Sequence, residues 1–138
     1  MMDRVENNAA TGLILVDLQN DFCHPEGTAA KRGHKVDDIY ETLERIADLL
    51  YFVRNKGLPV FHVVSQHSLW TQSPTGKERF GRKNQMPEQT YCAPHTWGSE
   101  VYPLFTPFPS EKVIVKHRYS VFLYTDLELV LMRKSLPI

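Results

Sequence analysis

Two β-rich runs separated by a stretch of helical periodicity are the feature that most constrains the fold of this chain. Residues 11–17, Thr-Gly-Leu-Ile-Leu-Val-Asp, form a short apolar run of the kind that suits a buried strand of a parallel sheet. Over Val36–Lys56 apolar residues recur every three or four positions, and Gly57 follows as a stop. Residues 59–64, Pro-Val-Phe-His-Val-Val, indicate the next strand. This order predicts a right-handed crossover between parallel strands, the start of a doubly wound α/β sheet.

The rest of the chain predicts a third strand and a second helix after a long irregular segment. Residues 18–34 mix polar residues with Pro and Gly, which indicates an irregular loop. Residues 65–109 also show little periodicity, and a segment this long is usually functional in a compact domain. We expect a short helix or two near residues 99–104 and a lid-like loop over a site. A strand at Lys112–Lys116 and a helix at Leu127–Lys134 complete the predicted elements.

Composition and charge favour a globular protein with a small-molecule partner. A chain of 138 residues, with 42% hydrophobic and 23% charged residues, fits a single domain over residues 1–138. Its 16 basic residues balance 16 acidic ones, so no overall field favours nucleic acid or anionic lipid. Residues 1–10 lack the basic and apolar regions of a signal peptide, and no apolar run is long enough to span a bilayer. We therefore expect a cytoplasmic protein whose two cysteines, Cys23 and Cys92, are free thiols.

Two opposite charges stand at the ends of predicted strands. Asp17 closes the first strand, at the carboxyl end where open α/β sheets bind their ligands, and Lys116 closes the third. Such charges can pair and can also transfer protons, so we expect the two side chains to meet at this edge of the sheet. The positions alone leave open that Asp17 caps a loop and that Lys116 is a solvated strand-end charge.

Three motifs resemble the isochorismatase-like cysteine hydrolases. Residues 13–22, Leu-Ile-Leu-Val-Asp-Leu-Gln-Asn-Asp-Phe, are similar to the opening signature of that family, and residues 113–122, Val-Ile-Val-Lys-His-Arg-Tyr-Ser-Val-Phe, to the second. Thr-Trp-Gly-Ser-Glu-Val at 96–101 resembles the intervening segment. The resemblance implies a three-layer α/β/α sandwich with a parallel sheet, and a catalytic set of Asp, Lys and Cys. In this set Asp17 would deprotonate the cysteine, and Lys116 would support the developing thiolate or oxyanion.

The resemblance does not extend to the nucleophile. In the family, the cysteine lies on the turn after a fourth strand, and Cys23 and Cys92 match neither that position nor its flanks. We therefore expect a chain that is truncated at its C-terminus before the nucleophile segment and inactive alone. Two functions remain: a hydrolase of a small amide, ureido or related substrate, complete in a longer form, or a non-catalytic isoform or fragment that binds or co-assembles with full-length subunits. A homo-oligomer is also left open.

The resemblance also bears on metals and on the substrate pocket. Nicotinamidase-like relatives bind a divalent ion through an Asp-x-His motif after the second strand, where this chain reads Ser65-Gln66-His67. We therefore expect no metal and no cofactor. Arg118 could bind a substrate carboxylate or face solvent. By position, four aromatic or imidazole side chains are expected to line the crevice, although each could instead be simple packing: Phe22, His67, Trp97 and Tyr119.

Overall fold

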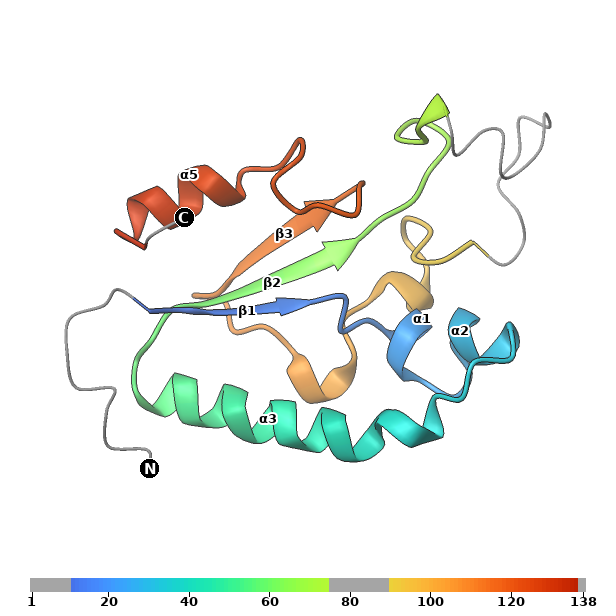
Figure 1. Ribbon diagram of the computed structural model, residues 1–138, viewed down its shortest axis with the longest axis horizontal. Coiled ribbons are helices and arrows are strands. Elements are labelled where there is room, and N and C mark those ends of the chain that lie inside the picture. The colour runs from blue at the N-terminus through green and yellow to red at the C-terminus, as the bar shows by residue number, and fades with distance from the viewer. Residues whose placement is uncertain (1–10, 75–89, 137–138) are drawn as a thin grey trace.

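The computed structural model describes residues 11–74 and 90–136, and a parallel three-stranded sheet forms its centre (Figure 1). The strands are β1 (Leu13–Val16), β2 (Val60–Ser65) and β3 (Lys112–Lys116), in the order β1-β2-β3. Both pairings are parallel. The predicted crossover and the predicted third strand are confirmed. Because β2 lies between the other two strands, β1 and β3 are not hydrogen-bonded to each other.

One face of the sheet is covered by α3 (Tyr40–Asn55), which follows a short 3-10 turn, η1 (Asp37–Ile39). The helical periodicity thus predicted this helix. In the structure, the first residues of the predicted stretch adopt the tighter 3-10 form. Buried leucine and valine side chains of α3 pack into a cluster with residues of β1 and β2 and with Phe105. Gly57 has a φ of +65°, a left-handed conformation that favours glycine, and it ends the helix as predicted.

The opposite face is covered by α5 (Leu127–Arg133) (Figure 1). Leu127 and Leu131 of this helix pack against β2 and β3, where they contact a cluster that contains Phe61, Val63 and Ile114. Helix, sheet and helix form the three layers of the predicted α/β/α sandwich. No helix among the described residues is long and apolar enough to cross a membrane.

The irregular segments contain more structure than their sequences indicate. Residues 18–34 were expected to be a loop, but they form two single-turn helices, α1 (Asn20–Cys23) and α2 (Thr28–Lys31). A helix of four residues is too short to show an apolar period, so the prediction was wrong there. The short helices expected near residues 99–104 are present as the 3-10 turns η2 (Trp97–Ser99) and η3 (Pro103–Phe105). Part of the expected lid-like loop lies outside the described residues.

Asp21 holds α1, α2 and the segment around Cys92 together. Asp21 is 6% exposed, and its carboxylate accepts hydrogen bonds from the backbone N of Thr28 at 2.9 Å, the hydroxyl of Thr28 at 2.7 Å and the backbone N of Cys92 at 2.6 Å. Gly98 lies directly against this carboxylate, since a Cβ atom there would be 2.3 Å from its Oδ1. The short helices are therefore stabilised by a buried carboxylate and not by their own length.

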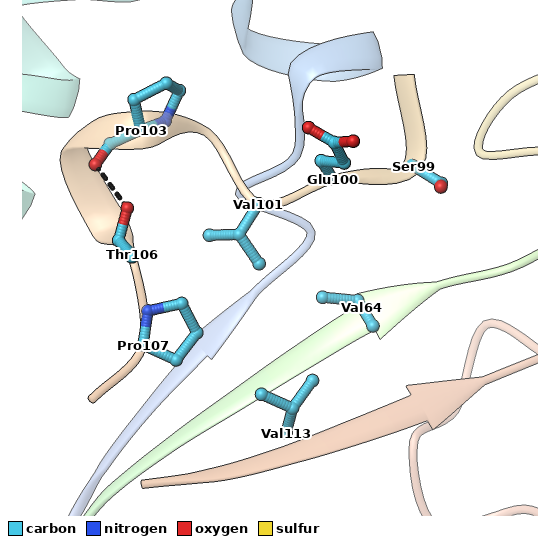
Figure 2. Close-up of a pocket in the computed structure, with 8 residues that line it drawn as sticks. All are labelled: Val64, Ser99, Glu100, Val101, Pro103, Thr106, Pro107 and Val113. Atoms are coloured by element: carbon cyan, nitrogen blue, oxygen red, sulfur yellow. Dashed lines mark hydrogen bonds between the residues drawn. The ribbon is translucent and has the colours of Figure 1, made fainter. Parts of the chain in front are cut away.

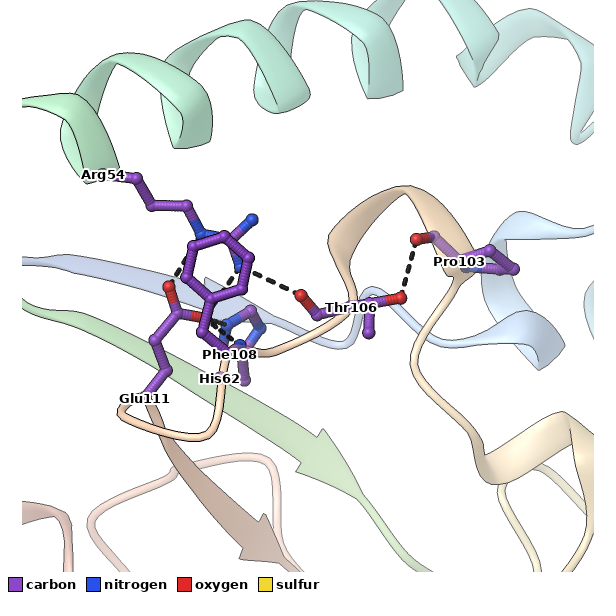
Figure 3. Close-up of polar contacts among 6 residues, drawn as sticks. All are labelled: Arg54, His62, Pro103, Thr106, Phe108 and Glu111. Atoms are coloured by element: carbon purple, nitrogen blue, oxygen red, sulfur yellow. Dashed lines mark hydrogen bonds and ion pairs between the residues drawn. The ribbon is translucent and has the colours of Figure 1, made fainter.

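At the opposite, amino-terminal end of β3, Glu111 joins the sheet to α3 (Figure 3). It accepts from Arg54 Nε at 2.7 Å and Nη2 at 2.8 Å, from the backbone N of Phe108 at 2.9 Å, and bonds His62 Nε2 at 2.8 Å. The Arg54 guanidinium also lies 3.7 Å from the centre of the Phe108 ring. Burial alone would raise the pKa of Glu111, but these donors outweigh it and lower the pKa to about 2.

Both outer edges of the sheet are unpaired among residues 11–74 and 90–136. On β1, the side chains of Ile14 and Val16 are 38% and 47% exposed, which is unusual for apolar residues of a parallel strand. This part of the sheet therefore presents both an open edge and an apolar face.

The Asp21 contacts predict a large loss of stability in the Asp21→Asn variant. The amide nitrogen would put a donor where backbone N–H groups now donate, so we expect the free energy of unfolding to fall by about 2–4 kcal/mol. Asp126→Asn is the matched control, because Asp126 forms an exposed ion pair with Lys112 and should change stability by no more than about 0.5 kcal/mol. Urea denaturation of the two variants measures the difference. Equal effects would contradict the role given to Asp21.

The Glu111 network predicts a stability contribution that depends on pH. A pKa of about 2 in the folded state and 4.5 in the unfolded state means that the stabilisation is present above pH 4.5 and is lost as the pH falls toward 2. The shift corresponds to roughly 3 kcal/mol. We expect the stability difference between the wild type and Glu111→Gln to shrink by about this amount between pH 7 and pH 2. The exposed Glu44→Gln variant is the control, and a constant Glu111→Gln difference over that range would refute the assignment.

Candidate active site

Asp17 is held at the carboxyl edge of the sheet in an unusual backbone conformation. It follows the last residue of β1, and its backbone N donates to the Val63 carbonyl at 2.9 Å, which extends the ladder by one bond. Its φ is +59°, in the left-handed region that residues other than glycine rarely adopt. A short aspartate side chain tolerates this conformation better than most residues do, and it bends the chain at the point where β1 ends.

Lys116 meets Asp17 at this edge, as predicted. Its Nζ lies 3.0 Å from Asp17 Oδ2, and the side chains are 7% and 32% exposed for Lys116 and Asp17 respectively. A buried ammonium group needs a partner for its charge, and Asp17 supplies it. Since Asp17 follows β1 and Lys116 ends β3, the ion pair spans the end of β2. The residue over which it passes is Ser65, the register partner of Lys116.

Ser65 and Gln19 complete the polar arrangement, and neither was recognised from the sequence. The Ser65 hydroxyl donates to Asp17 Oδ1 at 2.6 Å. The buried Gln19 side chain accepts from the backbone N of Ser65 at 2.7 Å and donates to the Ser65 carbonyl at 2.9 Å and to the Ser99 carbonyl at 2.8 Å. Sequence reasoning had treated Ser65 only as the place where a metal-binding aspartate is missing. Its contact with Asp17 depends on the strand register, which no local motif displays.

Three basic or imidazole side chains lie around the pair. Burial lowers the pKa of His67, and the positive charge of the nearby Lys116 lowers it further. His117 bonds the Gln66 carbonyl through Nδ1 at 2.9 Å. Arg118 Nη1 donates to the carbonyls of Thr71 and His117, both at 2.7 Å, and so fastens together the segments that follow β2 and β3. Arg118 thus has a role in holding the rim of the site, whether or not it also binds a carboxylate.

The four predicted pocket residues are placed differently from one another. His67 is close enough to Lys116 and Asp17 for their charges to act on it. Phe22 stacks on Tyr91, with ring centroids 5.1 Å apart, and is therefore used in packing. Trp97 is exposed and meets His24 edge to face, and Tyr119 is 94% exposed. Their role in binding a substrate stays a prediction.

The two cysteines of the chain are poorly suited to act as nucleophiles. Both are free, as expected, and both side chains are buried. Burial raises the pKa of Cys23 to about 11 and raises the pKa of Cys92 well above its usual range. A thiol must lose its proton before it attacks carbon, and these thiols keep theirs near neutral pH.

A groove of about 530 Å³ lies elsewhere on the molecule, between the sheet and residues 99–107 (Figure 2). Val64 and Val113 form its floor. Successive residues of a strand point to opposite faces, so these valines point away from the face of Ser65 and Lys116. The groove is therefore separate from the ion pair. In the described part of the chain, no three His, Cys, Asp or Glu side chains are arranged to hold a metal ion.

Comparison with known proteins gives relatives over nearly the whole chain. The chain is 32% identical over 117 residues to the uncharacterized isochorismatase family protein YddQ of Bacillus subtilis, an alignment that covers 85% of this chain and 52% of YddQ. It is 28% identical to the ureidoacrylate amidohydrolase RutB of Methylobacterium radiotolerans over an alignment of 145 positions. This alignment covers 92% of this chain and 53% of RutB. The chain thus spans about half the length of the curated relatives it matches.

Solved structures show the same fold. An isochorismatase family protein from Desulfovibrio vulgaris superposes with a TM-score of 0.73 at 28% identity, over 94% of this chain and 64% of that one. The nicotinamidase PncA of Bacillus subtilis superposes with a TM-score of 0.66 at 26% identity, over 92% of this chain and 66% of that one. The isochorismatase domain as a family matches residues 11–136. This match covers most of the chain and shows that it belongs to the isochorismatase family.

Proposed function

We propose that the chain carries the Asp and Lys of an Asp-Lys-Cys site in a hydrolase of a small amide, ureido or related substrate. The observation that supports this most directly is the 3.0 Å contact between Lys116 and Asp17 at the carboxyl edge of a parallel sheet. Amide chemistry is named in two of its relatives, the ureidoacrylate amidohydrolase of Methylobacterium radiotolerans and the nicotinamidase of Bacillus subtilis.

The proposed reaction gives each of the two residues a separate role. Asp17 takes the proton of the cysteine thiol as the sulfur attacks the carbonyl carbon of the substrate. Lys116 places its positive charge where the thiolate and then the oxyanion carry negative charge. The amine leaves with a proton, and water then attacks the thioester, releases the acid and restores the thiol. A carboxylate bonded at both oxygens is positioned for such repeated proton transfer.

The nucleophile in this proposal comes from outside these 138 residues. The chain has two cysteines, and both are buried, protonated thiols. The attacking cysteine would therefore belong to further residues of the same polypeptide or to a companion subunit. For residues 1–138 alone we expect no turnover.

A second candidate function is a non-catalytic chain that co-assembles with full-length subunits. The observation that favours it is the open edge of β1, where Ile14 and Val16 are exposed and no strand is paired among the described residues. An uncovered edge with an apolar face is a site for pairing with another strand. Under this alternative, the Asp17–Lys116 pair would have a structural role in the chain.

The hydrolase proposal predicts that ammonia release depends on Lys116 and on an added cysteine. We would assay a panel of small amides and ureido acids with the 138-residue chain and with a form extended through a cysteine-bearing fourth-strand turn. We expect release only from the extended form, and a fall of about 100-fold or more in kcat/KM for its Lys116→Met variant. Lys112→Met, at the other end of the same strand and in an exposed ion pair, is the matched control and should keep its activity.

Three outcomes separate the candidates. Full activity of the extended Lys116→Met variant would overturn the role of Lys116. Turnover by the 138-residue chain that is abolished in Lys116→Met would show that no outside cysteine is needed. If the extended form hydrolyses none of the panel while the 138-residue chain forms a stable complex with full-length subunits in size-exclusion chromatography, the non-catalytic function is favoured.

A further inference from the structure

We propose that Ser65 is a positioning residue that fixes the carboxylate of Asp17 so that one oxygen is anchored and the other works with Lys116. This inference rests on the proposed function, because it assigns a role to Ser65 in the proton transfer that Asp17 performs there. Ser65 contacts neither substrate nor nucleophile in this assignment and acts only through Asp17.

The topology of the sheet places Ser65 between Asp17 and Lys116. Asp17 and Lys116 follow strands that are not neighbours, since β2 lies between β1 and β3. Their 3.0 Å contact must therefore cross the end of β2, and the residue at that end is Ser65, which is paired in register with Lys116. A long side chain at this position would occupy the space that the ion pair spans. The position therefore requires a small residue.

The contact between Ser65 and Asp17 is a hydrogen bond to one carboxylate oxygen. The Ser65 hydroxyl donates to Oδ1 of Asp17 at 2.6 Å, a length typical of a hydrogen bond to an ionised carboxylate. Lys116 takes the other oxygen, Oδ2. With one oxygen bonded to each partner, rotation of the carboxylate about its own axis breaks both contacts. Ser65 thus distinguishes two otherwise equivalent oxygens and leaves Oδ2, beside the ammonium group, as the atom that accepts the proton.

The backbone of Ser65 is itself held in place by Gln19. Gln19 bonds both backbone groups of Ser65 with its side-chain amide, at 2.7 and 2.9 Å, as a neighbouring strand would. The same amide nitrogen also donates to the Ser99 carbonyl at 2.8 Å. A terminal strand residue normally frays, but here the end of β2 is held from the side by a buried group. The hydroxyl of Ser65 is therefore presented to Asp17 from a fixed backbone.

Threonine and valine at position 65 distinguish the effect of the hydroxyl group from the effect of side-chain size. The two side chains have nearly the same shape, but only threonine can donate to Asp17. A purely structural requirement for a small residue would make Ser65→Thr and Ser65→Val behave alike, whereas Ser65→Ala would be tolerated. The positioning role predicts the opposite grouping, with Thr close to the wild type and with Ala and Val both defective.

The test uses nuclear magnetic resonance on the 138-residue chain and needs no turnover. We would follow the Asp17 carboxylate carbon, assigned through its loss in Asp17→Asn, and the exchange of the Lys116 ammonium protons with water. We expect Ser65→Ala and Ser65→Val to shift the carboxylate signal and to speed the ammonium exchange by about tenfold, whereas Ser65→Thr keeps both near the wild type. Ser68→Ala is the control, because Ser68 bonds Thr71 in the next loop. Wild-type behaviour of Ser65→Ala, or equal behaviour of Thr and Val, would overturn the proposal.

A second measurement uses the extended, hydrolytically active form. There the positioning role predicts that Ser65→Ala and Ser65→Val lower kcat with little change in KM, and that Ser65→Thr restores kcat. If no form turns over any amide, the hydrolase proposal fails while the resonance measurement still decides whether Ser65 positions Asp17. If turnover is intact in Ser65→Ala, the inference about Ser65 fails and the hydrolase proposal stands.

Discussion

The buried ammonium group of Lys116 is the charge around which the carboxyl edge of the sheet is organised. The Lys116 side chain is only 7% exposed, so its charge needs a compensating carboxylate. Asp17 supplies it, with its Oδ2 atom 3.0 Å from Lys116 Nζ. That partner is within reach because the three strands are parallel and end at the same edge. An antiparallel β1 would place Asp17 at the opposite end of the sheet and leave the ammonium group uncompensated. The geometry of the site therefore depends directly on the parallel direction of the strands.

The carboxylates of Glu111 and Asp17 differ in how fully their hydrogen-bonding partners enclose them. Glu111, at the amino end of β3, is 7% exposed and receives bonds from Arg54, His62 and the backbone of Phe108. Its carboxylate is committed to holding α3 and the sheet together. Asp17, at the carboxyl end, has two side-chain partners and stays about one-third exposed. A carboxylate that is oriented but still reachable from solvent is open to a reacting group, whereas one enclosed by Arg54, His62 and the backbone of Phe108 is not. This contrast supports the assignment of the site to one end and of a structural clasp to the other.

The sequence predicted the elements that carry a long-range period and missed those that depend on distant contacts. The strands and α3 were predicted to within a few residues because apolar runs and a helical repeat extend over them. Asp17 and Lys116 were found because each closes such a strand. The helices α1 and α2 have one turn each and depend on Asp21, whose partners Thr28 and Cys92 lie 7 and 71 residues away in sequence. No local pattern reports a contact over that separation.

Ser65 and Gln19 were not recognised as members of the site for the same physical reason. Ser65 contacts Asp17 across 48 residues, and Gln19 contacts Ser65 across 46, so both roles follow from the register of β1 against β2. The aromatic residues show the same dependence, since Phe22, expected in the pocket by its place in the motif, stacks on the distant Tyr91, and its role in binding a substrate stays a prediction. A motif gives the order of residues along the chain, whereas the use of a side chain depends on what the fold places beside it.

The polar half of the site is held entirely by contacts within the described chain. Asp17 is bonded through its backbone to β2, through Oδ1 to Ser65 and through Oδ2 to Lys116, and Gln19 fixes the strand end beneath them. None of these contacts involves a cysteine. Under the proposed function, the nucleophile would therefore meet a base and a cation that are already oriented, so that little ordering remains to be done when the three groups come together. The free-energy cost of orienting Asp17 and Lys116 is then met by folding of the sheet, before any substrate binds.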